Sequence, residues 1–291
     1  MRCRTVMRCY HWISTHKLLS VITACVGVPL VLYSCLLVLA NTRAFVPREF
    51  HPRLLLVVAH PDDECLFFAP TLRALRRQYR VNLSLLVFSR GNHKGLGETR
   101  AIELRGSCQA LEIPVERCLS LDIAGVRDNP KEWWSEDTLI PIIEDHVRTW
   151  SIDVIVSFDR DGISGHINHR AVSASVRSLS RRKNQTRIKM AYELRSVSIL
   201  RKYSSLVDSY LVCVSFMPRL VRALLSRLTP WNLISPPDRS RMLLINTPSD
   251  YLVSRTAFSH HRTQFSWDRY LYLIASRYMF VNELVSVAAQ L

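Results

Sequence analysis

Three short apolar runs constrain the fold of this 291-residue chain more than any other feature of its sequence. They lie at residues 54–59, 84–88 and 153–158, are rich in Leu, Val, Ile and Phe, and are bounded by polar residues. A strand that is apolar along most of its length is typically buried on both faces, as in a parallel sheet covered by helices. Further strands are expected at residues 193–199 and 241–245.

The segments between these runs have apolar residues at the spacing of amphipathic helices. The predicted buried faces are formed by Ala101, Leu104, Cys108 and Leu111, by Ile140, Ile143 and Val147, and by Val172, Val176 and Leu179. Strands that alternate with helices predict βαβ units. We therefore expect an α/β fold with a Rossmann-like, mainly parallel sheet in one domain at residues 54–291.

Residues 18–40 form a run of 23 residues without a charge. A helix of that length covers the hydrocarbon slab of a bilayer, which is about 30 Å thick. The alternatives are a secretory signal peptide, which has a shorter apolar core, and a buried helix, which rarely stays uncharged for so long. The sequence thus predicts a basic lead (1–17), one transmembrane helix (18–40) and a linker (41–53). Basic residues flank both ends of the helix, so charge sets no orientation.

The formal net charge of +15 predicts an anionic partner, such as nucleic acid, a membrane surface or a phosphorylated substrate. In the segment 205–240, no acidic residue occurs between Asp208 and Asp238. Basic and apolar residues are interleaved there, namely Arg219, Arg222 and Arg227 with Leu220, Leu224, Leu225, Leu228 and Trp231. This pattern indicates an amphipathic insert that faces an anionic membrane, or equally a helix packed on the domain with its arginines exposed.

The eight cysteines are scattered and include no Cys-x-x-Cys pair. This spacing predicts neither a disulfide scaffold nor a structural zinc site. Glycosylation sequons occur at Asn82 and Asn184. They carry little weight, because chance matches are common and Asn82 falls in an expected strand.

Polar clusters follow the first and third apolar runs. His60-Pro-Asp-Asp-Glu64 comes directly after the first run, and the third leads into a segment that ends at His169. Ligands bind beyond the carboxyl ends of the strands in such sheets, so the two clusters are expected to converge. His60, Asp63 and His169 then supply three ligands of a tetrahedral divalent metal, for which Zn²⁺ is the best fit, and leave the fourth position for water.

The remaining polar residues of the two clusters suggest catalytic roles. Asp62 is the expected general base, and His166 stabilises an oxyanion or, as imidazolium, protonates a leaving amine. Asp159 is expected to orient His166. Taken singly, the acids also suit a helix cap and His169 suits a solvated position, but two such clusters at strand ends favour a catalytic metal.

Three motifs carry a family resemblance: A-H-P-D-D-E at 59–64, G-N-x-x-G-x-G-E-T-R at 91–100 and G-x-S-G-H-x-N-H at 162–169. They resemble the LmbE-like, PIG-L-type metal-dependent de-N-acetylases, over residues 54–203 and again near 259–282. The resemblance implies metal binding by the residues at His60, Asp63 and His169, a base at Asp62 and an oxyanion role for His166. It also implies sugar–phosphate contacts from Arg100, with Asn92 and Glu103. Asp161 departs from the pattern, because a small residue is more usual there.

The resemblance further implies a function. The expected reaction is zinc-dependent removal of the N-acetyl group from N-acetylglucosamine linked to phosphatidylinositol, the second step of glycosylphosphatidylinositol-anchor synthesis. The expected location is the endoplasmic reticulum membrane, with the catalytic domain on the cytoplasmic face and against an anionic surface. Alternatives are a deacetylase of another N-acetylglucosamine glycoconjugate and a non-catalytic membrane adaptor. Nucleic-acid binding is ranked last, because it explains neither the apolar helix nor the metal pattern.

Overall fold

The computed structural model describes residues 17–40, 45–46, 52–182, 187–225 and 240–290. Seven strands form one sheet: β1 (Arg53–Val58), β2 (Asn82–Val87), β3 (Cys118–Ser120), β4 (Val154–Phe158), β5 (Met190–Leu194), β6 (Arg241–Ile245) and β7 (Val281–Ser286). Their order is β3-β2-β1-β4-β5-β7-β6. β7 runs antiparallel to both of its neighbours, and the other pairs are parallel. The expected α/β fold with a mainly parallel sheet is therefore confirmed.

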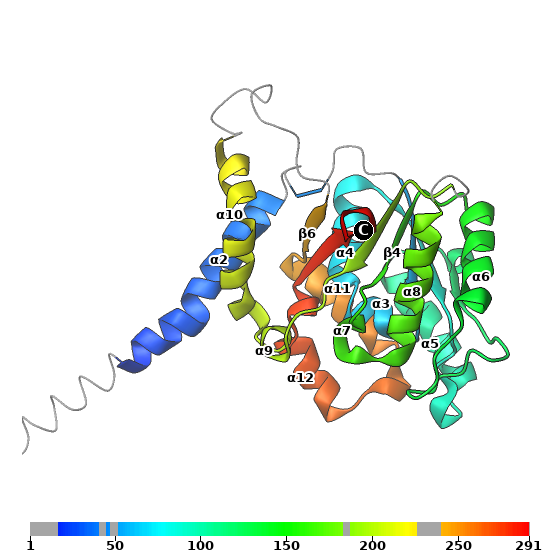
Figure 1. The fold of residues 1–291 in the computed structure, drawn as a ribbon. Helices are drawn as coiled ribbons and strands as arrows, with labels where there is room; N and C mark the ends of the chain where they lie inside the picture. The colour runs from blue at the N-terminus through cyan, green and yellow to red at the C-terminus, as the bar shows by residue number, and fades with distance from the viewer. Residues whose placement is uncertain (1–16, 41–44, 47–51, 183–186, 226–239, 291) are drawn as a thin grey trace, which may run out of the picture.

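Helices cover the sheet on both faces (Figure 1). The longer ones are α4 (Ala69–Tyr79), α5 (Gly97–Ala110), α6 (Glu136–Thr149), α8 (Ile167–Arg181), α10 (Ser209–Leu225), α11 (Pro248–Ser259) and α12 (Trp267–Ala275). Shorter ones are α3 (Asp63–Leu66), α7 (Gly162–Gly165) and α9 (Ile199–Lys202), with single turns η2 (Asn92–Lys94), η3 (Val115–Arg117), η4 (Ser205–Asp208), η6 (Arg262–Gln264), η7 (Arg277–Met279) and η8 (Val287–Gln290).

The sheet changes winding direction between β1 and β4. From β1 the chain moves outward to β2 and β3, and from β4 it moves the other way to β5. Right-handed crossovers then place the two sets of helices on opposite faces. α8 packs on β1, β4 and β5, whereas α4 packs on β2, β6 and β7. The predicted helical faces are confirmed, since Leu104, Ile143 and Val176 are buried.

Strand boundaries differ from the expectation in one place. The strand expected at 193–199 lies instead at 190–194, and residues 199–202 form α9. The chain leaves the sheet after Leu194, where the backbone N–H and hydroxyl of Ser196 donate to Asp159. β3 and β7 were not anticipated, because β3 has three residues and β7 contains buried Asn282 and Glu283.

The N-terminal helix runs through η1 (Thr23–Gly27) and α2 (Val28–Ala40). Residues Lys17–Val38 are long and apolar enough to cross a membrane, by length and composition. The later part of this helix packs against α10 and β6. A second apolar core forms there, with members Tyr33, Leu36, Phe45, Val212, Cys213, Phe216, Leu220, Leu243, Ile245 and Val281. Arg227, Leu228 and Trp231 of the expected insert lie outside the described residues.

Cys108 of α5 and Cys118 of β3 form a disulfide. The cysteine spacing did not predict it, because the two residues meet only when α5 returns alongside the sheet edge. Asn82 is exposed at the first position of β2, whereas the other two residues of its sequon, Leu83 and Ser84, are buried.

Candidate metal centre and active site

The predicted site residues meet at the carboxyl ends of β1 and β4. These strands are neighbours at the point where the winding direction changes, which is where α/β sheets bind ligands. The segment after β1 places His60 and Asp62 in a loop and Asp63 at the start of α3. After β4, His166 caps the N-terminus of α8 and His169 lies in its first turn. All five line one cavity of about 610 Å³. The convergence expected from the sequence is therefore present.

The side chains of His60, Asp63 and His169 form a close triangle of donor groups in this cavity. Nδ1 of His60 lies 3.3 Å from Nε2 of His169, which lies 3.2 Å from Oδ1 of Asp63. Nδ1 of His60 is 3.7 Å from Oδ2 of the same carboxylate. Ligand atoms around a tetrahedral zinc ion are separated by about 3.3 Å, given bonds of about 2.0–2.1 Å. The donor spacing fits a small divalent metal.

The other ring nitrogens of both histidines already have partners. Nδ1 of His169 lies 3.1 Å from the carbonyl oxygen of Gly162 and is placed to donate to it. Nε2 of His60 faces Oδ1 of Asp128 at 3.2 Å and the side-chain oxygen of Asn168 at 3.3 Å. Such partners leave His60 Nδ1 and His169 Nε2 with free lone pairs that point to the shared centre. The tautomers therefore suit metal ligation.

Asp63 is held as a carboxylate. Its Oδ2 accepts the backbone N–H groups of Ala59 and His60 at 3.1 and 2.8 Å. Burial by itself raises the pKa of a carboxyl group, but His169 and His60 outweigh this and hold the pKa of Asp63 well below its usual range. An ionised oxygen, Oδ1, thus faces the centre.

Asp62 lies beside this triangle and has an unusual backbone. Its φ of 119° is positive, which is rare outside glycine. Its carboxylate oxygens are 3.7 Å from Arg100 and 3.8 Å from Arg269, too long for hydrogen bonds. Burial raises the pKa of Asp62 despite these guanidinium groups. Within the part of the chain that the structure describes, the carboxylate has no close hydrogen-bonding partner, and its raised pKa suits a general base.

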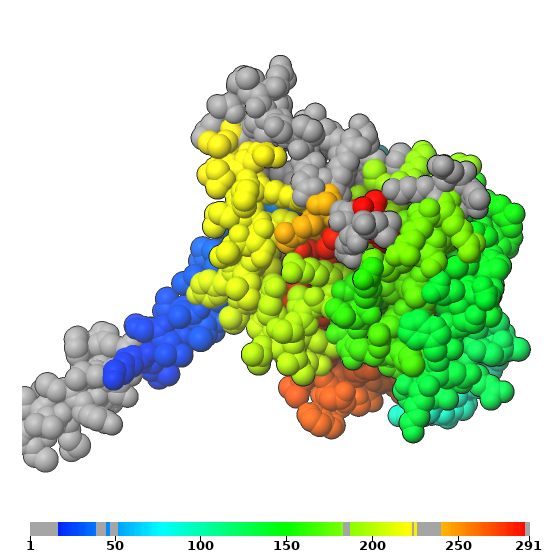
Figure 2. Space-filling model, viewed as in Figure 1, coloured from blue at the N-terminus to red at the C-terminus, as the bar shows by residue number. Residues whose placement is uncertain are grey.

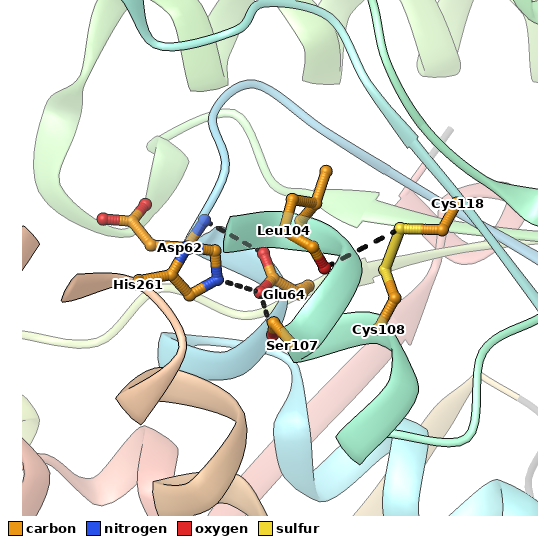
Figure 3. Close-up of a disulfide and its surroundings, with 7 residues drawn as sticks. All are labelled: Asp62, Glu64, Leu104, Ser107, Cys108, Cys118 and His261. Carbon is orange, nitrogen blue, oxygen red and sulfur yellow. Dashed lines mark hydrogen bonds and ion pairs between the residues drawn. A yellow bond between two sulfur atoms is a disulfide. The ribbon is translucent and has the colours of Figure 1, made fainter. Parts of the chain in front are cut away.

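A buried network fixes the Asp62 backbone (Figure 3). Oε2 of Glu64 accepts the N–H of Asp62 at 3.0 Å. Oε1 of Glu64 accepts the hydroxyl of Ser107 at 2.5 Å and faces Nε2 of His261 at 2.7 Å. Ser107 precedes the disulfide-bonded Cys108, so α5 and the His261 segment both support the base. Sequence reasoning missed Ser107 and His261, because His261 is 197 positions from Glu64.

His166 is positioned as a neutral hydrogen-bond donor. The backbone N–H of Asn168 donates to its Nδ1 at 3.3 Å, so the proton of a neutral ring is on Nε2. Burial and repulsion from the His60 and His169 rings lower the pKa of His166 to about 4. Of the two roles expected for His166, this state suits oxyanion stabilisation.

Arg100 lines the cavity and also holds its loops together. Nη1 donates to the carbonyl of Gly91 at 3.1 Å, and Nη2 donates to that of Pro61. Gly91 has φ of 66°, and a Cβ at this position would lie 2.2 Å from Nη1 of Arg100. The glycine at the start of the second motif therefore allows the arginine to reach the Asp62 loop.

The other predicted contacts lie outside this cavity lining. The side-chain oxygen of Asn92 accepts the N–H of Gly97. Glu103 accepts the N–H and hydroxyl of Thr263 at 2.8 and 2.7 Å. Asp159 binds Ser196 and the N–H of Gly162, so it shapes the loop that carries His166, whereas the structure records no bond from Asp159 to the ring. Substrate contact by Asn92 and Glu103 stays a prediction.

Lys202 and Arg269 also line the cavity and add positive charge to it. Lys202 is buried, and its ammonium lies 5.8, 5.5 and 5.9 Å from the ring centres of Phe67, Tyr203 and Tyr272. Burial, and then Arg269, lower the pKa of Lys202. No ion pair is found for its ammonium among the described residues. The cavity thus presents the ammonium of Lys202, beside the guanidinium of Arg269, to an anionic ligand.

The fold and this site define the class of protein as an α/β protein with a candidate metal centre at the carboxyl ends of its strands. A deacetylase of the teicoplanin biosynthetic pathway has the same fold, with a TM-score of 0.50 and 13% identity over 80% of this chain and 97% of that one. The PIG-L family model, described as GlcNAc-PI de-N-acetylase, matches residues 55–180.

Curated relatives extend the match to most of the chain. The chain is 37% identical over 232 residues to N-acetylglucosaminyl-phosphatidylinositol de-N-acetylase of Bos taurus, covering 80% of this chain and 82% of that protein. It is 32% identical over 244 residues to the protein of the same name from Saccharomyces cerevisiae, covering 78% and 79%. The chain belongs to the PIG-L family, as the sequence motifs indicated.

Proposed function

We propose that this protein removes the acetyl group from N-acetylglucosaminyl-phosphatidylinositol, giving glucosaminyl-phosphatidylinositol and acetate. The reaction is the second step of glycosylphosphatidylinositol-anchor synthesis. The observation that carries the proposal is the convergence of His60, Asp63 and His169 beside Asp62, in a chain so similar to relatives of that name. A metal site with an adjacent base is one arrangement that promotes hydrolysis of an amide.

The metal is proposed to be Zn²⁺, because two imidazoles and one carboxylate are its common catalytic ligand set. Bound there, it would supply Lewis acidity and lower the pKa of water. Asp62 takes a proton from the attacking water and returns it to the leaving nitrogen. The Nε2–H of His166 donates to the oxyanion of the tetrahedral intermediate. The products are acetate and a free glucosamine amine.

Asp128→Asn is expected to weaken zinc binding about 10–100-fold, because the carboxylate that orients His60 and raises its basicity is lost. Competition with a chromophoric chelator measures the affinity. Asp145→Asn, on an exposed face of α6, is the matched control and should leave the affinity unchanged. An Asp128→Asn protein with wild-type affinity would exclude this role for Asp128.

Lys202 and Arg269, which line the cavity, are proposed to bind the phosphate of the substrate, in addition to the contacts predicted for Arg100, Asn92 and Glu103. Lys202→Gln should raise KM for the phosphate-bearing substrate roughly tenfold and change kcat little. The variant loses the contact with the substrate phosphate but keeps Asp62, the proposed base. Initial rates of acetate release across substrate concentrations measure both constants. For N-acetylglucosaminyl-inositol without phosphate, the variant and the wild type should have equal KM. An equal rise in KM for both substrates would contradict the proposal that Lys202 binds the phosphate.

The proposed substrate is tested with purified full-length protein in vesicles. Acetate release should be much faster with the lipid-linked sugar than with its lipid-free headgroup. Equal turnover of the two would favour the alternative, a deacetylase of another N-acetylglucosamine glycoconjugate.

We further propose that residues 17–38 anchor the protein in the endoplasmic reticulum membrane with the domain in the cytoplasm. Disulfides such as Cys108–Cys118 are more typical of oxidising compartments, so orientation needs a direct test. In sealed microsomes, added protease should digest the domain, and glycosidase should leave its mobility unchanged despite the exposed Asn82. Protection from protease together with a glycan on Asn82 would reverse the orientation.

A further inference from the structure

Large apolar side chains are exposed on two short helices beside the cavity. On α9, Ile199 is 71% and Leu200 83% exposed, and on α12, Trp267 is 76% and Ile274 65% exposed. Single exposed apolar residues are ordinary on soluble proteins, but a contiguous group of this size marks an interaction surface.

The two helices flank the cavity mouth. Tyr203, directly after α9, and Trp267 and Leu271 of α12 line the cavity. The hydroxyl of Ser205 donates to the carbonyl of Ile274 at 2.8 Å, which joins the segment after α9 to the end of α12. The exposed apolar groups and the opening of the active site therefore share one face.

The same face continues to the N-terminal helix. At the start of α10, the hydroxyl of Tyr210 donates to the carbonyl of Ala24 at 2.7 Å, and that of Ser209 to Pro29 at 3.2 Å. α10 exposes Leu211 and Val214. Figures 1 and 2 show the first half of the blue helix projecting from this side of the molecule, next to yellow α10. Apolar surface thus runs from the candidate membrane span through α10 to α9 and α12.

We propose that α9, α12 and the start of α10, here termed the interfacial surface, insert into the leaflet that residues 17–38 enter. The cavity mouth then opens at the headgroup level, where Lys202 and Arg269 meet a lipid phosphate. Aromatic and aliphatic side chains next to a polar cavity suit a position at the membrane interface. The net charge of +15 complements an anionic leaflet. The inference rests on the proposed function for its substrate, but the lipid contact itself is independent of catalysis.

Photo-crosslinking in vesicles tests the contact directly. Purified full-length protein is reconstituted in phosphatidylcholine and phosphatidylinositol with a trace of diazirine-bearing phosphatidylcholine. Cross-links mapped by mass spectrometry are expected in residues 199–214 and 267–275, besides 17–38, and not in α5. Labelling confined to 17–38 would overturn the proposal and leave the surface for a protein partner.

A charge-insertion variant tests the consequence. Leu200→Glu combined with Ile274→Glu, neither of which lines the cavity, should lower cross-linking of both helices at least fivefold. It should also lower kcat/KM for the lipid-linked substrate roughly tenfold, while lipid-free headgroup turnover and the melting temperature are unchanged. The control is Ile102→Glu with Leu252→Glu, two residues that are also more than half exposed, on α5 and α11. Unchanged cross-linking in the test variant contradicts insertion. If the wild type is cross-linked to lipid but does not deacetylate the substrate, the proposed function is wrong and the lipid contact still holds.

Discussion

Replacing His169 with alanine is expected to abolish acetate release, lowering kcat/KM by roughly a thousandfold or more. The change removes Nε2, which lies 3.3 Å from Nδ1 of His60 and 3.2 Å from Oδ1 of Asp63. Two ligands remain, too few to hold the ion in catalytic geometry. Metal content should fall to background in the same protein. Membranes from cells that express wild type or variant, assayed side by side, give the measurement.

The control for this variant is His146→Gln. His146 lies on α6, away from the cavity, with Nδ1 at the carbonyl of Ile142. Activity and metal content should match the wild type. A His169→Ala protein that still deacetylates at a normal rate would refute the metal site. A wild-type protein that binds metal but releases no acetate would instead support the membrane-adaptor alternative.

Asp62→Asn is expected to lower kcat about 10²–10⁴-fold while metal binding is retained. Asparagine keeps the size of the side chain and tolerates the left-handed backbone, but it cannot accept the proton of water. The hydrogen bond from the backbone N–H of residue 62 to Glu64 is unaffected by the substitution. Rapid-mixing or steady-state assays at saturating substrate measure kcat, and elemental analysis measures the metal.

Asp161→Asn is the matched control for the base. Asp161 is exposed on the loop after β4, and its position departs from the family pattern without touching the donor triangle. The activity of the Asp161→Asn variant should stay within about twofold of the wild-type activity, as for most substitutions of surface residues. If Asp62→Asn were as active as Asp161→Asn, another group would have to be the base.

The core of the site was predictable from sequence because its residues come in two short clusters. His60, Asp62 and Asp63 are set by the end of β1, and His166 and His169 by the end of β4. Neighbouring parallel strands end at the same edge of the sheet, so the polar clusters that follow β1 and β4 lie close together in space.

The residues that support the site from distant parts of the chain occur singly, and no sequence pattern predicted them. Asp128 reaches His60 from the segment after β3, a strand of three residues that was not anticipated. His261 meets Glu64 across 197 positions, and Lys202 is the last residue of α9, beyond the strand that was expected at 193–199. No periodicity in the sequence marks a single polar residue as a partner of another loop.

The amino-acid sequence alone determined the alternation of strands and helices, the apolar N-terminal helix and the two polar clusters whose side chains meet in the cavity. These follow from local patterns: runs of apolar side chains, helical spacing and polar clusters at strand ends. Only the tertiary structure decided the ring tautomers, the Asp62 support by Glu64, the disulfide and the joining of α9, α12 and α10 into one apolar face. Each of these depends on side chains that meet after long stretches of chain have packed together.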